Sequence, residues 1–192
     1  MLIDSHTHIL DEAFDNDRQE TIKRAFDAGI TAIFEIACEE KLWDKAEQLA
    51  ALDNIYLSFG IHPHEAQNAV QADFERLLKL LSLKKCAAIG ETGLDYHYDF
   101  SPRDIQRKVF LRHIDISIEK RKPIIIHCRK AIEYIISILK SYRKLPKGVI
   151  HSFEGSLEDA QVFIDMGFML GVCSTITYPK CEQIREVFAS ID

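Results

Sequence analysis

The residues best suited to chemistry in this sequence are its histidines. Of the eight, seven fall at or just beyond the end of a predicted strand, namely His6, His8, His62, His64, His97, His127 and His151. Parallel strands bring their carboxyl ends to one rim, so these imidazoles are expected to converge there. Because neutral imidazole nitrogens bind divalent metal ions, the pattern predicts a metal site at that rim.

The motif His6-Thr7-His8 provides a first pair of ligands. Residues two apart on a strand point to the same face, so the two imidazoles can bind one divalent ion. The alternative is that two polar residues end a strand and meet solvent. The position of the motif on the first predicted strand favours the metal.

A second set of ligands consists of Glu91, His127 and His151. Glu91 ends the apolar run 87–91, and a carboxylate has two oxygens with which to bridge two ions. His127 and His151 each close a neighbouring apolar run. The alternatives are a solvated loop acid and histidines that cap core strands. Taken together, the residues predict two divalent ions that share Glu91; zinc, magnesium and manganese all remain open.

Further polar residues follow the third and fourth predicted strands. His62 and His64 belong to Gly-Ile-His-Pro-His, and Asp95 and Tyr96 follow Glu91 in the next motif. We expect these four residues to position the substrate, and His62 to take part in catalysis with Glu91. For His64, a role as an exposed loop residue is equally compatible with the sequence.

The elements that must position these residues alternate between apolar runs and helical patterns. Seven strands are predicted, at 2–6, 31–37, 55–61, 86–91, 123–127, 148–152 and 168–172, and helices at 18–28, 66–83, 105–121, 156–166 and 179–192. Such alternation indicates parallel strands joined by helices. Seven units of about 27 residues fall one short of the eight units of a closed barrel. The sequence thus predicts an α/β fold, an incomplete TIM-type barrel in a single domain over residues 1–192, with an open doubly wound sheet as the alternative.

Composition narrows the class of protein. The formal net charge of −6 disfavours non-specific binding of polyanions, so a phosphate substrate needs local positive charge. No apolar run is long enough to span a membrane, and the first residues lack the pattern of a signal peptide. The five cysteines are odd in number and show no disulfide spacing. These features predict a cytoplasmic protein that does not bind membranes. Cys128 and His113 are assigned to packing.

Five motifs together resemble the successive signatures of the TatD family of metal-dependent hydrolases. They are Asp4-Ser5-His6-Thr7-His8, Gly60-Ile61-His62-Pro63-His64, Gly90-Glu91-Thr92-Gly93-Leu94-Asp95-Tyr96, Pro123-Ile124-Ile125-Ile126-His127-Cys128-Arg129 and His151-Ser152-Phe153-Glu154-Gly155-Ser156. The resemblance implies a barrel and a metal-dependent deoxyribonuclease that hydrolyses phosphodiesters of DNA. It also implies that His6 and His8 hold one ion, that His127 and His151 hold the other, and that Glu91 bridges the two ions.

One departure from the family pattern concerns its eighth strand. The family carries there an aspartate that completes the first metal site and handles a proton of the attacking water, and the sequence stops before it; Asp192 is given no ligand role. One alternative is therefore a truncated, catalytically impaired metal-binding protein, and another is a C–N hydrolase of amidohydrolase type. The absent strand also predicts self-association across the gap.

Overall fold

The chain alternates strands with helices, and the computed structural model describes residues 1–191. The strands are β1 (Leu2–Thr7), β2 (Ile30–Ala37), β3 (Ile55–Phe59), β4 (Cys86–Asp95), β5 (Ile124–Arg129), β6 (Gly148–His151) and β7 (Phe168–Leu170). The helices are α1 (Arg18–Asp27), α2 (Trp43–Leu49), α3 (Gln71–Leu80), α4 (Arg103–Lys120), α5 (Ile132–Lys140), α6 (Leu157–Asp165) and α7 (Glu182–Ser190). Short 3-10 turns η1 (Glu12–Phe14), η2 (Glu40–Leu42), η3 (Pro63–Asn68) and η4 (Ser174–Thr177) complete the connections.

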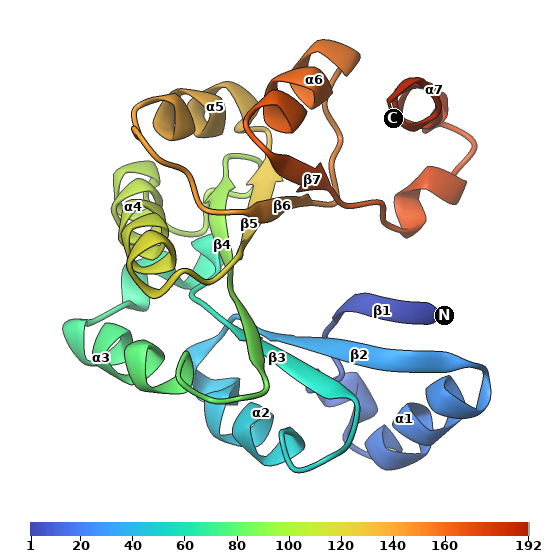
Figure 1. Ribbon diagram of the computed structural model, residues 1–192. Coiled ribbons are helices and arrows are strands. Elements are labelled where there is room, and N and C mark those ends of the chain that lie inside the picture. Colours follow the sequence, from blue (N-terminus) through green and yellow to red (C-terminus); the bar gives the residue numbers. More distant parts are fainter. Residues whose placement is uncertain (192) are drawn as a thin grey trace.

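The seven strands form one parallel sheet in the order β1-β2-β3-β4-β5-β6-β7. Figure 1 shows this sheet curled into part of a barrel, with helices around its convex side. A doubly wound sheet would require the strand order to reverse, and this order is sequential. The prediction of an incomplete TIM-type barrel is therefore confirmed. Within residues 1–191, no strand pairs with the outer edge of β1 or of β7.

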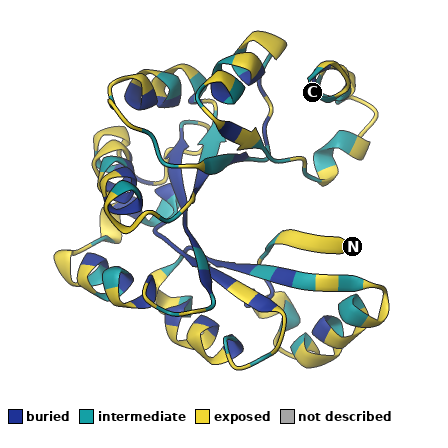
Figure 2. Cartoon of the chain, viewed as in Figure 1, coloured by how far each residue is buried: buried dark blue, intermediate teal, exposed yellow. Residues whose placement is uncertain are grey.

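The main core lies between the convex face of the sheet and the helices. It is built from large apolar side chains that are fully buried, among them Trp43, Phe59, Phe110, Ile114 and Phe163. A smaller cluster on the concave face contains Ile36, Cys38, Ala88 and Ile125. In Figure 2 the central strand β4 is buried along its length and the edge strand β1 is exposed over most of its residues. The middle of the sheet thus forms the rigid part of the scaffold.

Two helix ends show how the sequence sets the boundaries. Ser156 caps α6, since its Oγ accepts from the backbone N–H of Asp159 and the Asp159 carboxylate accepts from that of Ser156, which confirms the predicted capping box. Gly29 and Gly167, which follow α1 and α6, adopt positive φ angles of 98° and 85°. No helix in the described part of the chain is long and apolar enough to cross a membrane.

The structure corrects several predicted boundaries. The predicted helix 66–83 is divided, because the chain is extended at Val70, whose N–H donates to the Asp73 carboxylate at the start of α3. β4 continues four residues beyond Glu91, so Glu91 lies within the strand and not at its end. α2 and α5 were not among the predicted helices. Asp192 lies outside the described residues.

Glycines allow the backbone around Glu91 to approach its neighbours closely. A Cβ at Gly93, where φ is +150°, would lie 2.0 Å from the backbone oxygen of His127. A Cβ at Gly90 would lie 2.5 Å from the backbone oxygen of Ile125. Only glycine fits such contacts, so Gly90 and Gly93 let β4 pack closely against β5 on either side of Glu91 in the sequence.

Candidate metal centre

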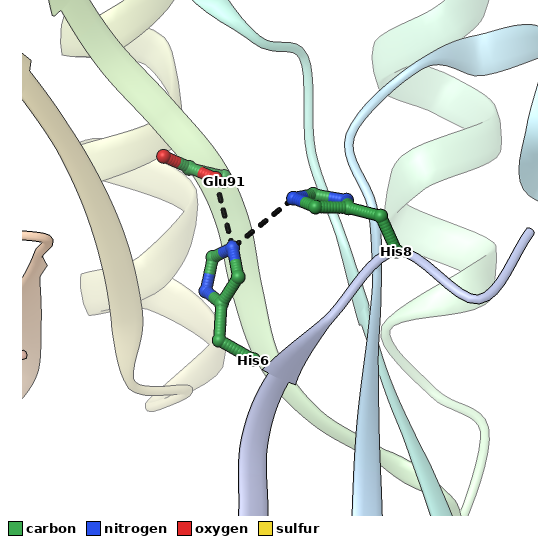
Figure 3. A group of neighbouring side chains, drawn as sticks. All are labelled: His6, His8 and Glu91. Carbon is green, nitrogen blue, oxygen red and sulfur yellow. Dashed lines mark hydrogen bonds and ion pairs between the residues drawn. The ribbon is translucent and has the colours of Figure 1, made fainter. Parts of the chain in front are cut away.

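The first group of possible ligands joins β1 and the residue after it to β4. The Nε2 atom of His6 lies 3.2 Å from Nε2 of His8 and 3.2 Å from Oε2 of Glu91. Figure 3 shows the two rings and the carboxylate pointing toward one another. The three donor atoms lie within 4.8 Å of one another, close enough to surround one ion.

The second group shares Glu91 and draws on β5 and the chain after β3. The Nδ1 atom of His127 lies 2.9 Å from Oε1 of Glu91 and 3.2 Å from Nε2 of His62. The three residues again place donor atoms within 4.8 Å. Each Glu91 oxygen therefore faces a different histidine group, which is the arrangement that a bridging carboxylate requires.

The protonation states suit a divalent ion. Burial raises the pKa of the Glu91 carboxyl, but hydrogen bonds from His127 and His6 outweigh it and hold that pKa well below its ordinary value. Burial, together with the neighbouring His6, lowers the pKa of His8. The Nδ1–H of His8 donates to the backbone oxygen of Ile36 at 3.2 Å, which leaves its Nε2 lone pair facing the group. An ionised carboxylate together with an imidazole nitrogen that has a free lone pair, as at His8, forms a donor set that fits a divalent metal.

Asp95 orients His127 from the side away from Glu91. The Nε2–H of His127 donates to Oδ2 of Asp95 at 3.0 Å, and the Nε2–H of His64 donates to the same oxygen at 2.8 Å. Burial raises the pKa of Asp95, but hydrogen bonds from the backbone of Tyr98 and from His64 outweigh it, so that the pKa falls to about 2. Asp95 is ionised at neutral pH and accepts the Nε2 proton of His127. Burial lowers the pKa of His127, but its hydrogen bonds to Glu91 and Asp95 outweigh burial and raise that pKa. An ion bound at Nδ1 would take the place of the proton that this nitrogen shares with Glu91.

His62 and His151 differ in how their ring nitrogens are used. Nδ1 of His62 accepts from the backbone N–H of His64 at 3.3 Å, so the proton of the neutral ring is on Nε2, which faces His127. The His151 ring stacks on that of His6, with centroids 3.5 Å apart, and lies outside the two groups above. Burial lowers the pKa of His62 to about 3 and that of His151 to about 4. Both rings are neutral at pH 7.

Two cavities open on either side of Glu91. One, of about 340 Å³, is lined by Glu91, His127, Arg129, His151 and Glu154 among others. The other, of about 680 Å³, lies toward the loop after β1 and is lined by His62 and His64, with Asp11, Glu39 and Lys41 among others. Both histidine groups are therefore accessible to a ligand.

Sequence reasoning missed Glu35 on β2, which is fully buried. Its Oε2 accepts from the backbone N–H of Ile9 at 2.7 Å and from Oγ1 of Thr7 at 3.2 Å. Burial raises the pKa of Glu35 to about 7. These contacts fix the chain on either side of His8. An acid within the apolar run 33–37 was the available signal.

His113 is confirmed as a structural residue. It is fully buried in α4, its Nδ1–H donates to the backbone oxygen of Val109 at 2.8 Å, and its Nε2 accepts from the backbone N–H of Ile61 at 3.1 Å. The second bond fixes the chain just before His62. Burial lowers the pKa of His113 to about 4.

The lowered pKa of His113 predicts that the free energy of unfolding depends on pH. Below pH 6.5 the unfolded chain binds a proton at residue 113 that the folded chain does not bind, so stability falls as the pH falls. Between pH 7 and pH 5 the wild type is expected to lose about 2 kcal/mol more unfolding free energy than His113→Gln. Urea unfolding of both proteins at the two pH values checks this. A difference in unfolding free energy between the wild type and His113→Gln that is the same at both pH values would contradict this prediction.

Three further residues considered in the sequence analysis, Tyr96, His97 and Cys128, belong to neither of the two histidine groups. Tyr96 is partly buried beneath Arg103, whose guanidinium carbon lies 4.3 Å from the ring centroid, and its ring does not face the histidine groups in any contact within residues 1–191. His97 is exposed. Burial raises the pKa of Cys128 to about 12, so its thiol is protonated, in agreement with a packing role.

Known proteins of one family are similar to this chain in sequence and in fold. The family described as TatD related DNase matches residues 3–192. The chain is 36% identical over 193 residues to an uncharacterized metal-dependent hydrolase, YabD, of Bacillus subtilis, covering all of this chain and 76% of YabD. It is 30% identical to the 3'-5' ssDNA/RNA exonuclease TatD of Shigella flexneri, covering 96% of this chain and 70% of that one. The crystal structure of YjjV, a TatD homolog from Escherichia coli, superposes with a TM-score of 0.92 at 30% identity, covering all of this chain and 75% of YjjV.

Proposed function

The chain belongs to the TatD family of metal-dependent hydrolases, and from this premise we propose that it hydrolyses phosphodiester bonds of single-stranded nucleic acid at a two-metal site. The observation that carries the proposal is Glu91, whose two oxygens face two different histidine groups. A relative named as an exonuclease of single-stranded DNA and RNA supports this choice of substrate.

We propose that His6, His8 and Glu91 hold one ion, and that Glu91, His127 and His151 hold the other. Zinc, magnesium and manganese are the candidates. When bound, such ions polarise a phosphodiester and neutralise the charge that develops on its oxygens. In this way they add positive charge to a protein whose net charge is −6.

The other residues act through hydrogen bonds. His62 directs its Nε2–H into the centre and is suited to donate to an oxygen of the substrate, which is the catalytic role proposed for it. Asp95 keeps the Nε2 proton of His127 in place and holds His64 at the rim. We propose that His64 and Tyr96 contact parts of the substrate further from the reacting phosphate.

We further propose that residues 1–192 form a single domain that acts in the cytoplasm. One large apolar cluster that extends from the β1 loop to α7 supports a single domain. All five cysteines are free thiols, as is usual in a reducing compartment.

We also propose that the 192-residue chain self-associates along the open edges of β1 and β7. In support, Leu2, Ile3 and Met169 on these strands are exposed, and unpaired edges are usually covered. Sedimentation of a stable monomer at micromolar concentration would contradict this.

Removal and return of metal tests the proposed function. Metal-stripped protein is expected to lose hydrolysis of a single-stranded oligonucleotide by at least about 100-fold, because the site then lacks its Lewis acids. Zinc, manganese or magnesium, added singly, is expected to restore it. The measurement is release of nucleotides together with metal content.

The same assay separates the alternatives. Hydrolysis of a cyclic amide in preference to the oligonucleotide would favour a C–N hydrolase. Bound metal without hydrolysis of either compound would favour a catalytically impaired metal-binding protein.

A further inference from the structure

An exposed aromatic pair lies beside the metal centre, in the loop that follows β4. Tyr98 is 48% and Phe100 59% exposed. Their rings are nearly parallel, with an interplanar angle of 3° and centroids 5.1 Å apart. The two stacked rings pack against His64 at the rim of the metal centre, and about half of each side chain remains exposed as apolar surface.

Arg129 joins this pair to the cavity. Its guanidinium carbon lies 4.6 Å from the centroid of Tyr98, and the residue lines the cavity that contains Glu91 and His127. No carboxylate within residues 1–191 forms a salt bridge with Arg129. Arg129 therefore supplies local positive charge between the metal centre and the aromatic pair.

The pair is also close enough to serve the same substrate. The His64 ring lies 4.8 Å from the ring of Phe100 and 6.1 Å from that of His127, measured between centroids. A nucleic-acid strand rises about 3.4 Å per nucleotide when its bases are stacked. A base one or two nucleotides from a phosphate at the metal centre can thus reach the rings.

The loop that carries the pair is held at both ends. Oδ1 of Asp95 accepts from the backbone N–H groups of His97 and Tyr98, each at 3.0 Å. At the other end, Oγ of Ser101 donates to the backbone oxygen of His64 at 2.8 Å, and Nε2 of Gln106 donates to that of Ser101 at 2.8 Å. A surface fixed before binding costs little entropy to use.

We propose that Tyr98, Phe100 and Arg129 form a stacking platform that binds a nucleobase of single-stranded nucleic acid next to the metal centre. Base stacking on aromatic rings, assisted by arginine, is the general means of holding single strands without reading their sequence. The proposal rests on the proposed function, because it names a subsite for the same substrate. Its occupant is a base, whereas the metal centre takes a phosphate.

A binding experiment tests the platform without turnover. The metal-loaded chain is titrated into two labelled phosphorothioate oligomers, one of thymidine and one of abasic residues, and fluorescence anisotropy gives the affinities. The wild type is expected to bind the thymidine oligomer about tenfold more tightly. Phe100→Ala and Tyr98→Ala are each expected to lose most of this preference, with little change toward the abasic oligomer. Arg129→Gln is expected to weaken both and to reduce the salt dependence by about one charge.

Tyr56→Ala is the matched control, because Tyr56 also stacks on an aromatic ring, Phe34, beside a cation, Lys85. Tyr56 lies on β3, before the chain turns toward His62, and the variant is expected to keep the wild-type preference. Equal affinities of the wild type for the two oligomers, as a protein-binding role of the loop would give, would overturn the proposal. A preference that Phe100→Ala retains would overturn it too.

Hydrolysis of the unmodified thymidine oligomer is measured in parallel. Binding that depends on bases without hydrolysis would refute the proposed function and leave the platform standing. Hydrolysis without base-dependent binding would support the proposed function and refute the platform.

Discussion

Glu91→Gln is expected to reduce phosphodiester hydrolysis by about 1,000-fold or more and to lower the content of both metal ions. The carboxylate is 3% exposed, and each of its oxygens faces a different histidine group. Glutamine keeps the size of the side chain but has one oxygen and no charge, so it can serve at most one ion. A loss of about 4 kcal/mol in stabilisation of the transition state corresponds to this factor.

Glu154→Gln provides the matched control for this prediction. Glu154 lines the same cavity and is exposed, and it takes no part in the histidine groups. Its substitution is expected to change the rate no more than a few-fold. Thermal melts of the metal-free proteins show whether Glu91→Gln still folds. A Glu91→Gln protein that holds two ions and keeps a tenth of the activity would refute the bridging role.

The order of the strands and the site at their carboxyl ends could be predicted from the sequence. Apolar runs that alternate with helical patterns fix a parallel sheet, and a parallel sheet brings His6, His127 and His151 to one rim. The capping box at Ser156 was also predictable, because its bonds join residues three apart. These inferences depend only on local pattern and on the general geometry of parallel strands.

Other features depend on contacts between residues far apart in the chain. Glu35 accepts a hydrogen bond from the backbone of Ile9, which is 26 residues away. The sequence shows an acid within the apolar run 33–37 but not which backbone groups it contacts. The platform was missed because Tyr98 and Phe100 look like ordinary loop aromatics until Arg129 lies beside them. A sequence lists the possible ligands, but the partner of each ring nitrogen is set by the fold.

The assignment of His62 and His151 shows why that partner matters. By distance alone, His62 belongs to the second group with Glu91 and His127, and His151 does not. Yet Nδ1 of His62 already accepts a backbone hydrogen bond, so its Nε2 carries the proton and has no lone pair for an ion. His151 is neutral, lines the cavity with Glu91 and His127, and keeps both ring nitrogens free of hydrogen bonds within residues 1–191.

His151→Ala is therefore expected to bind one ion per chain in place of two, and to lose hydrolysis by about 100-fold or more, because Glu91 and His127 alone are too few ligands for the second ion. His62→Ala is expected to keep both ions and to lose about tenfold in rate, the usual scale for one hydrogen bond to the reacting group. Elemental analysis of the purified variants and their rates on one oligonucleotide distinguish the two roles. The opposite result, one ion in His62→Ala and two in His151→Ala, would mean that metal binding moves the His62 proton and that distance, not the present hydrogen bond, identifies the ligand.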